Sequence, residues 1–337
     1  MRFVPAHLLD GRPHVIVDGA PRPGTVYTLS HWPGTPTPIG LDGDLSAEIV
    51  AHALARPDLL PEPVPVVSLD HYDVDGVVSL ALAVLDGLAA THGPLLTEVA
   101  RVGDFDVVTR RDAALIAFSL AALADGGSGG GAPPGADGAD GLALCAMLSA
   151  TALGLVGDLV ADAERFEDLW HGQYAAYEAS VGALAAGWAT VEEVPSLDLA
   201  VVRVDSAHER AAAAAWKAAP LHPAAVHGVS DALRVASFSE GRMEMRYRYE
   251  SWVRLASRRP RPRVDLERLA RRLTAGEEWG SRWVFDGAGA LRGALHLAGV
   301  EATTSIEPAR LLGLLSEELA LLDQGPAAWD PYRAPRG

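Results

Sequence analysis

Short apolar runs that end in polar residues predict three buried strands in the first third of the chain. These runs are residues 14–17, 25–29 and 64–69. Apolar segments of helical length lie between and after them, at residues 45–54, 76–88 and 112–123. Buried strands that alternate with helices are typical of a parallel sheet covered on both faces. We therefore expect an N-terminal α/β domain with a mainly parallel sheet flanked by helices.

The pattern changes in the middle of the chain. Residues 126–141 form a Gly/Ala/Pro/Asp tract without apolar periodicity, which predicts a flexible surface loop. Helices are then expected at residues 142–162 and 164–188. The remainder predicts a smaller α/β domain, with strands or hairpin arms at 199–204, 233–238, 242–255, 282–285 and 291–297 and helices at 264–273 and 308–322. We expect one domain over residues 1–190 and a second over 195–325, with the boundary at Pro195.

Composition narrows the class of protein. A length of 337 residues corresponds to about two domains, and 49% hydrophobic with 21% charged residues excludes a disordered chain. The single cysteine, Cys145, excludes a disulfide framework and favours a reduced, cytoplasmic setting. The N-terminus lacks a signal-peptide pattern. The longest apolar run, residues 142–156, is shorter than the ~20 residues that a membrane span requires, so we interpret it as a buried helix and expect no membrane partner.

The net charge of −16 opposes binding of long duplex nucleic acid. Residues 242–282 are an exception, because they hold twelve arginines against six acidic residues. Arginine contacts phosphate through two parallel N–H donors, so this stretch could hold a small anionic ligand. A solvated basic surface is the alternative.

The strongest chemical signal is the run Asp70-His71-Tyr72-Asp73-Val74-Asp75-Gly76. A predicted strand leads into it and a predicted helix follows it. Ligands of open α/β sheets bind at the carboxyl ends of strands, and the alternate residues His71, Asp73 and Asp75 could converge there. Carboxylates with imidazole and no thiolate suit Mn²⁺ or Mg²⁺. The alternative is an Asp-rich capping loop whose charges are solvated.

Three other polar residues lie at comparable positions. Asp18 ends the first predicted strand, His31 follows the second, and Asp104 precedes a predicted helix. We expect each of them at a strand-to-loop junction. Clustered carboxylates without a metal would repel one another and raise one another's pKa, whereas two divalent cations would neutralise four of them.

These motifs resemble those of the DHH phosphoesterase superfamily. The first motif is matched by His71-Tyr-Asp73-Val-Asp75-Gly76, and the second by the strand that ends in Asp18-Gly19. Residues 28–34 resemble the segment around Asp-His-His, residues 44–50 the helix start that follows it, and residues 102–105 the fourth motif. The second and third motifs precede the first, as in a circular permutation. The resemblance covers roughly residues 12–120.

The resemblance implies a dinuclear manganese site and hydrolysis of a phosphoester or phosphoanhydride by a metal-bridged water. Mg²⁺ is the alternative ion. The chain is also compatible with a homodimer. The substrate would be a small phosphorylated molecule or a short oligonucleotide. The implied catalytic residues are His71, Asp73 and Asp75. The implied metal ligands are Asp18, His31, His71, Asp73, Asp75 and Asp104.

The match to the family is incomplete in two places. Asp-His-His is replaced by Ser30-His31-Trp32, so Trp32 stands where the family's second histidine contacts phosphate. The C-terminal half resembles the substrate-binding domain, with Arg254 on a recognition strand and His296 after a short glycine loop, and this implies that Trp32, Arg254 and His296 bind substrate. Trp32 also favours an alternative, a catalytically degenerate protein that binds metal or phosphate.

A second alternative is a phosphatase of the haloacid-dehalogenase type. Asp73 would then be the nucleophile and Asp75 the acid/base, with Mg²⁺ between them. Asp158 and Asp162 match the late acidic motif of that family. However, Asp70-His71-Tyr72 separate the strand from the nucleophile, and no lysine lies between the two motifs. This alternative also leaves the positions of Asp18 and His31 unexplained.

Overall fold

The computed structural model describes residues 1–124, 139–205, 221–239, 241–299 and 302–333. Most of the predicted loop 126–141 lies outside the described residues, and its last three residues begin a helix. The described chain forms two compact units. Unit 1 comprises Met1–Tyr174 together with Arg254–Arg259, and unit 2 comprises Ala175–Val253 and Pro260–Ala334. Both units combine helices with a sheet, so the protein is of the mixed α/β class.

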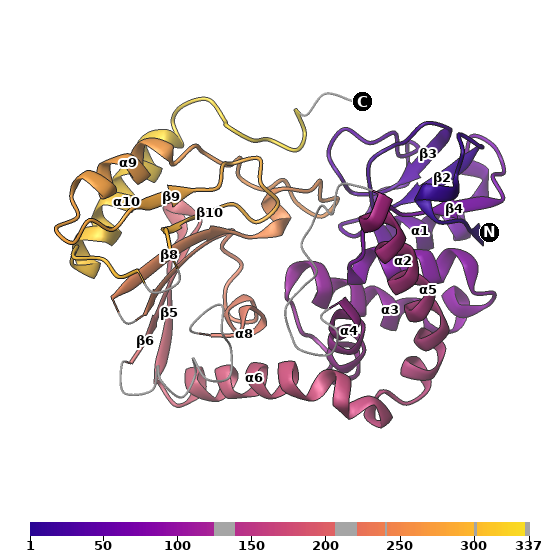
Figure 1. The fold of residues 1–337 in the computed structure, drawn as a ribbon, viewed down its shortest axis with the longest axis horizontal. Coiled ribbons are helices and arrows are strands. Elements are labelled where there is room, and N and C mark those ends of the chain that lie inside the picture. Colours follow the sequence, from indigo (N-terminus) through magenta and orange to yellow (C-terminus); the bar gives the residue numbers. More distant parts are fainter. Residues whose placement is uncertain (125–138, 206–220, 240, 300–301, 334–337) are drawn as a thin grey trace. The chain divides into compact units, whose positions relative to one another are not determined.

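Unit 1 contains a four-stranded parallel sheet with the order β1-β4-β2-β3 (Figure 1). Its strands are β1 (Arg2–Phe3), β2 (His14–Val17), β3 (Thr25–Leu29) and β4 (Val66–Ser68). All four residues of β2 are buried, as expected for a strand covered on both faces. The predicted strands at 14–17 and 25–29 coincide with β2 and β3. Strand β1 has only two residues and was not predicted.

Among the described α-helices of unit 1, the sequence predicted five and missed one. They are α1 (Ser46–Ala55), α2 (Val74–Val84), α3 (Leu88–Phe105), α4 (Arg111–Ala124), α5 (Ala139–Ala161) and the first half of α6 (Glu167–Ala185). The unexpected helix is α3, whose interior holds Pro94 and Gly103, residues that normally oppose helix. Gly103 has a packing reason, because a Cβ there would lie 2.4 Å from Cβ of Val74.

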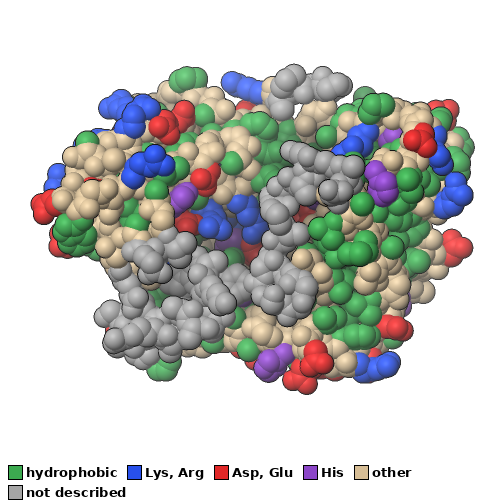
Figure 2. Space-filling view, viewed as in Figure 1, with side chains coloured by type: hydrophobic (Ala, Val, Ile, Leu, Met, Phe, Trp, Pro, Cys, Tyr) green, Lys and Arg blue, Asp and Glu red, His purple; other side chains and the backbone are tan. Residues whose placement is uncertain are grey.

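Helix α5 is the apolar segment that we expected to be buried. The structure corrects this expectation, because only 33% of its most apolar window is buried. Figure 2 shows hydrophobic side chains gathered along this helix, and Leu144 and Met147 are 44% and 58% exposed. Gly141–Ala161 is long and apolar enough to cross a membrane. Core helices of soluble proteins can have the same length and composition. Its Ala, Gly and Ser residues can face either core or solvent, so the sequence does not distinguish its two sides.

Unit 2 contains a mixed six-stranded sheet with the order β5-β6-β7-β8-β10-β9. Its strands are β5 (Ala189–Val194), β6 (Leu199–Val204), β7 (Arg234–Ser239), β8 (Arg242–Tyr247), β9 (Trp283–Phe285) and β10 (Ala294–Leu297). Only β6 and β7 pair in parallel. The helices are α8 (Pro223–His227), α9 (Glu267–Ala275) and α10 (Pro308–Leu322). The predicted hairpin is the β7–β8 pair.

Two expectations for unit 2 were wrong. The segment before Pro195 is strand β5, which was not predicted because its exposed positions are the polar residues Thr190, Glu192 and Glu193. Strand β8 ends at Tyr247, and Tyr249–Ser251 form a short 3₁₀ helix. Arg254 therefore does not lie on a strand. It belongs to Arg254–Arg259, which packs with unit 1 although its neighbours on both sides in the chain belong to unit 2.

Candidate metal centre

Three of the predicted site residues follow the carboxyl ends of neighbouring parallel strands. Asp18 comes directly after β2, His31 follows β3, and His71 follows β4. Asp18 has a φ of +44°, in the left-handed region that few residues other than glycine adopt. Asp adopts this region more readily than most residues, and Asp10, Asp106 and Asp198 do so elsewhere in the chain. A side chain at the next residue would also be crowded, because a Cβ on Gly19 would lie 3.0 Å from Oδ1 of Asp70.

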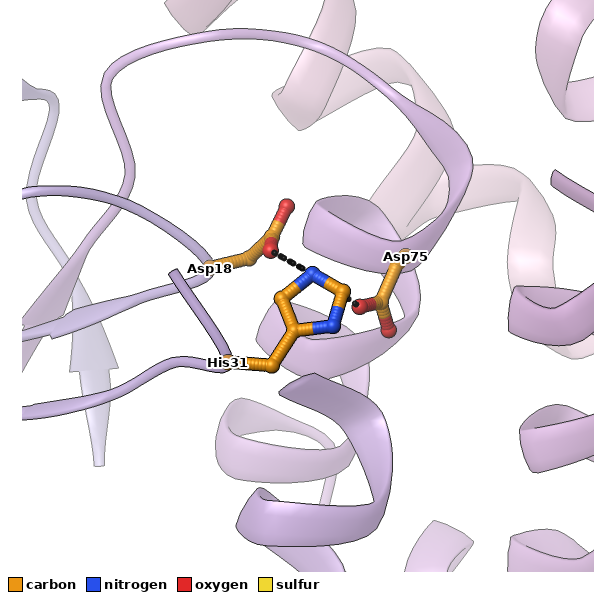
Figure 3. A group of neighbouring side chains, drawn as sticks. All are labelled: Asp18, His31 and Asp75. Carbon is orange, nitrogen blue, oxygen red and sulfur yellow. Dashed lines mark ion pairs between the residues drawn. The ribbon is translucent and has the colours of Figure 1, made fainter. Parts of the chain in front are cut away.

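The ring of His31 is buried and held in one orientation. Its Nδ1 donates to the backbone carbonyl of Asp44 at 2.7 Å, which leaves Nε2 as the nitrogen that faces the carboxylates. Nε2 lies 3.5 Å from Oδ1 of Asp18 and 3.9 Å from Oδ2 of Asp75 (Figure 3). It also lies 3.4 Å from Oδ2 of Asp104. A histidine whose other nitrogen is fixed in this way is the usual arrangement for a metal ligand.

Helix α2 supplies two carboxylates because of how it begins. Asp73 is its N-cap, and Oδ1 of Asp73 accepts a hydrogen bond from the amide of Gly76 at 2.8 Å. Asp75, in the first turn, accepts from the amides of Ser46 and Ala47 at 2.8 and 2.9 Å and so caps α1. Each carboxylate oxygen has two lone pairs, so both residues retain acceptor capacity for a cation.

Asp104 is part of the cluster but not in the way that we predicted. It lies in the last turn of α3, not after a strand, and its side chain is buried. The sequence around Gly103 resembles a loop, but this residue lies inside α3, where the lack of a side chain lets it pack closely against Val74 of α2. Asp104 therefore lies on a helix and not at a strand-to-loop junction, but its side chain still faces His31.

The candidate ligands form two groups that share one carboxylate. Asp18, His31 and Asp75 form a buried group, and Asp18, His71 and Asp73 form a second one that is partly exposed. Within each group the ligand atoms lie within 4.8 Å of one another. Six-coordinate ions with metal–oxygen distances of about 2.1 Å place their ligand atoms roughly 3–4 Å apart, so the spacing fits a divalent cation. A carboxylate common to two groups is the arrangement of a dinuclear centre.

The donor set gives a further test of this fit. Oδ2 of Asp18 is buried, and among the residues that the structure describes it has no hydrogen-bond partner. It lies 3.3 Å from Nε2 of His71. Leaving a buried carboxylate oxygen without a hydrogen bond costs free energy, which a cation bound between the two groups would offset. Carboxylate and imidazole ligands suit a divalent cation.

The ionisable groups of the cluster perturb one another strongly. Burial and the charge of Asp18 raise the pKa of Asp75 to about 7. Burial would also raise the pKa of Asp18, but the facing imidazoles of His31 and His71 outweigh it and hold that pKa well below its usual range. Burial alone would lower the pKa of His31, yet the carboxylates of Asp18 and Asp75 raise it. We expected the clustered carboxylates to raise one another's pKa. The pKa of Asp75 is raised as expected, whereas that of Asp18 is lowered.

The His71 end of the cluster is its accessible end. The side chains of His71 and Asp73 are 24% and 37% exposed, and Nε2 of His71 lies 3.0 Å from Oδ2 of Asp73. The Trp32 ring lies against His71, with ring centroids 5.1 Å apart. A substrate would approach the cluster from this side, next to Trp32.

The other two predicted substrate-binding residues occupy different places. Arg254 is close to the cluster through its backbone, because its amide donates to the carbonyl of His31 at 2.9 Å. His296 belongs to unit 2, where Nε2 lies 3.1 Å from Oδ1 of Asp286 and Nδ1 lies 3.0 Å from the carbonyl of Leu297. The carboxylates of the alternative late acidic motif, Asp158 and Asp162, are exposed and belong to neither ligand group.

Sequence reasoning missed three residues that orient the ligands. Oδ1 of Asp70 lies 3.1 Å from Nδ1 of His71, and Oδ2 of Asp70 accepts from Nε of Arg22 at 3.2 Å. Ser46 donates its hydroxyl to Oδ1 of Asp18 at 2.7 Å. Asp44 holds the ring of His31 through its carbonyl. A carboxylate directly before a candidate histidine was a usable signal for Asp70, whereas a backbone carbonyl leaves no signal in the sequence.

Comparison with known proteins places the chain in one family. Residues 1–331 match the family described as "Family of unknown function (DUF6687)", and the chain therefore belongs to that family. Comparison with curated proteins and with solved structures gave no match.

Proposed function

We propose that this protein is a metal-dependent phosphoester or phosphoanhydride hydrolase of the type that the DHH resemblance implies. The observation that carries this proposal is the pair of ligand groups that share Asp18. Their members are the residues to which the resemblance assigns a dinuclear manganese site. The strand order supports it as well, because β2, β3 and β4 are adjacent and parallel and bring three separate motifs to one edge of the sheet.

Each metal position has its own residues. Asp18, His31, Asp75 and Asp104 would hold the buried ion, and Asp18, His71 and Asp73 the accessible one. When bound, two Mn²⁺ ions supply a water of lowered pKa as nucleophile and positive charge for the phosphoryl oxygens. Mg²⁺ would satisfy the same oxygen-rich ligands.

The remaining residues of the site would bind and orient the substrate. We propose that Arg254, whose amide is bonded to the carbonyl of His31, contacts the substrate phosphate. Trp32 presents an indole, which can donate one N–H but cannot carry positive charge or accept a proton near neutral pH. The substrate is proposed to be a small phosphorylated molecule or a short oligonucleotide.

Metal binding is the direct test of this proposal. Metal-free protein titrated with Mn²⁺ in a calorimeter should bind two ions per chain, and elemental analysis of gently purified protein should give the same number. Mg²⁺ titrated in parallel distinguishes the two ions. A stoichiometry of zero for both ions would overturn the site and the function together.

The alternative of a degenerate binding protein is favoured by one observation, the Trp32 ring against His71. Loss of a charged phosphate contact should lower turnover by about 10²–10³-fold. Hydrolysis of nucleotides, short oligonucleotides, cyclic dinucleotides and pyrophosphate should therefore be slow in the wild type and faster in Trp32→His. If both proteins bind Mn²⁺ but neither hydrolyses any of these, the binding protein is the better description. The dehalogenase-type alternative has less support, because its Asp158 and Asp162 are exposed on and just after α5.

A further inference from the structure

The segment Arg254–Arg259 is attached to the candidate site by four hydrogen bonds. The amide of Arg254 donates to the carbonyl of His31 at 2.9 Å. The amides of Ala256 and Ser257 both donate to Oδ1 of Asp44 at 2.8 Å, and the Ser257 hydroxyl donates to Oδ2 of Asp44 at 2.6 Å. We name the three bonds to the Asp44 carboxylate the Asp44 clamp. They join residues more than 200 positions apart in the chain.

Asp44 is connected to His31 at the same time. Its backbone carbonyl accepts from Nδ1 of His31 at 2.7 Å. Its amide donates to Oε2 of Glu48 at 2.7 Å, and Oε1 of Glu48 accepts from Arg101 at 2.8 Å. The backbone of Asp44 is therefore held on one side by α1 and α3, and its side chain is held on the other side by the clamp.

We propose that Asp44 is a positioning residue that makes the orientation of His31 depend on the attachment of Arg254–Arg259. This segment is bonded to His31 in two ways. The amide of Arg254 donates directly to the carbonyl of His31. The clamp holds Asp44, whose own carbonyl accepts from the ring of His31. A distant part of the chain is thereby part of the site. The part of this inference that concerns metal binding rests on the proposed function.

The chemistry of the clamp fits this role. Hydrogen bonds to an ionised carboxylate are shorter and roughly twice as strong as those between neutral groups. A carboxylate that accepts from two consecutive amides and a hydroxyl fixes the position of its own residue as well as that of the donors. The neighbouring position also requires glycine, since a Cβ on Gly43 would lie 2.8 Å from Cβ of Glu48. Residues 43 and 44 therefore have little freedom to move when the clamp is in place.

Variants of the clamp give a graded series. Asp44→Ala removes all three bonds, Asp44→Asn keeps an acceptor for the amides but loses the charge, and Ser257→Ala removes one bond and keeps the charge. Asp42→Ala is the matched control. Asp42 is exposed, and within the described residues it accepts only from His52, through its backbone carbonyl. Its replacement removes a negative charge two residues from Asp44.

The first measurement needs no metal. Hydrogen exchange of the amides of Ala256 and Ser257 should become at least about tenfold faster in Asp44→Ala than in the wild type. The ring signal of His31, identified by its loss in His31→Ala, should shift or broaden in Asp44→Ala and stay unchanged in Asp42→Ala. An unchanged His31 signal together with fast exchange at residues 256 and 257 would show that the clamp only secures a loop, and would overturn the proposal.

The second measurement is Mn²⁺ binding by calorimetry. Loss of a group that orients a ligand typically weakens metal affinity by about 10–100-fold. We expect Asp44→Ala to weaken Mn²⁺ affinity to this extent at one of the two sites. The loss of affinity should be less than about tenfold in Asp44→Asn and smaller still in Ser257→Ala. Asp42→Ala should bind Mn²⁺ like the wild type. If Asp44→Ala and Asp42→Ala lost the same Mn²⁺ affinity, the loss would be due to the removed negative charge alone, and the proposal would be overturned. Absence of Mn²⁺ binding by the wild type would instead overturn the proposed function, while the His31 signal would still decide the role of Asp44.

Discussion

Both units bury charged side chains, and one cluster from each unit shows two different ways in which buried charge is compensated. In unit 2, Arg263 is fully buried and donates all of its guanidinium N–H groups. The acceptors are the hydroxyl of Ser251 and the carbonyls of Arg248, Ala288, Ala290 and Leu291. In unit 1, three buried carboxylates surround the single imidazole of His31. The guanidinium of Arg263 is fully hydrogen-bonded within unit 2, whereas the cluster around His31 contains more carboxylates than imidazoles.

The difference separates a structural cluster from a candidate functional one. A buried charge is tolerated when hydrogen bonds or an opposite charge compensate for the loss of water. Arg263 meets this condition through backbone carbonyls, so its site needs no ligand, and burial only lowers its pKa to about 10. The Asp18 cluster meets it in part, with a buried oxygen of Asp18 that has no hydrogen bond within the described structure. A cation would compensate the remaining charge of the Asp18 cluster, whereas the site of Arg263 already holds a cationic side chain and needs none.

The largest effect should come from the carboxylate that the two ligand groups share. We expect Asp18→Asn to abolish Mn²⁺ binding at both positions, because an amide lacks the charge that two ions would share. His31→Ala and His71→Ala should each keep one ion per chain. Calorimetric titration of the metal-free variants gives these stoichiometries.

The control for Asp18→Asn removes a carboxylate outside both ligand groups. Asp158→Asn changes an exposed residue on α5 and should bind two ions, like the wild type. If Asp18→Asn retained two ions, the shared position of Asp18 would be disproved, and the contrast between the two units would lose its main support.

A smaller effect should come from a compensated pair in unit 2. Asp323 accepts from both terminal nitrogens of Arg234, at 2.8 and 2.6 Å, and from Arg261 at 2.7 Å. Asp323→Asn should lower the free energy of unfolding by about 2 kcal/mol at pH 7, less than the roughly 3–5 kcal/mol of a fully buried pair, because this side chain is 15% exposed. Urea unfolding measures it. The matched control is Asp58→Asn, which breaks a fully exposed pair with Arg56 and should leave stability unchanged.

The same pair predicts a pH dependence. Burial would raise the pKa of Asp323, but Arg234 and Arg261 outweigh it and hold that pKa below its ordinary value of 3.8. A carboxylate with a lowered folded-state pKa stabilises the protein above its unfolded pKa, and this contribution is lost as the pH falls through the folded value. The difference between wild type and Asp323→Asn should therefore be full at pH 7 and shrink below about pH 3.8. A difference that stays constant down to pH 2 would contradict the assignment.

The sequence predicted the elements of unit 1 best where strands are wholly apolar. Residues 14–17 and 25–29 alternate with helices at the spacing of a parallel sheet and coincide with β2 and β3. It failed at α3, because Pro94 and Gly103 oppose helix and only the packing of Gly103 on Val74 explains that glycine. It failed at β5 for the opposite reason, since the charged residues of this strand face solvent.

Asp18, His31 and His71 could be predicted as candidate ligands because each follows the end of a strand that the hydrophobic pattern marks. Asp104 could be predicted as a residue, but its element, α3, could not. The groups that orient these ligands could not be predicted. The carbonyl of Asp44 and the amides that Asp75 accepts from are backbone atoms, which every residue possesses. The attachment of Arg254–Arg259 joins distant positions and leaves no local pattern. Local sequence patterns therefore marked the candidate ligands, whereas only the tertiary structure revealed the groups that orient them.

The smallest expected effect concerns the accessible end of the cluster. Oδ1 of Asp70 lies 3.1 Å from Nδ1 of His71, so the carboxylate orients the ring whose Nε2 faces Asp18 and Asp73. Asp70→Asn keeps the shape but loses the charge, and its amide group would face either His71 or Arg22. We expect about tenfold weaker Mn²⁺ binding at the His71 position and no change at the His31 position. Two-site calorimetry measures both affinities, with Asp10→Asn, an exposed carboxylate of the same unit, as the control. Equal weakening at both positions would mean that Asp70 acts by charge alone, because orientation of His71 can affect only the position that His71 helps to form.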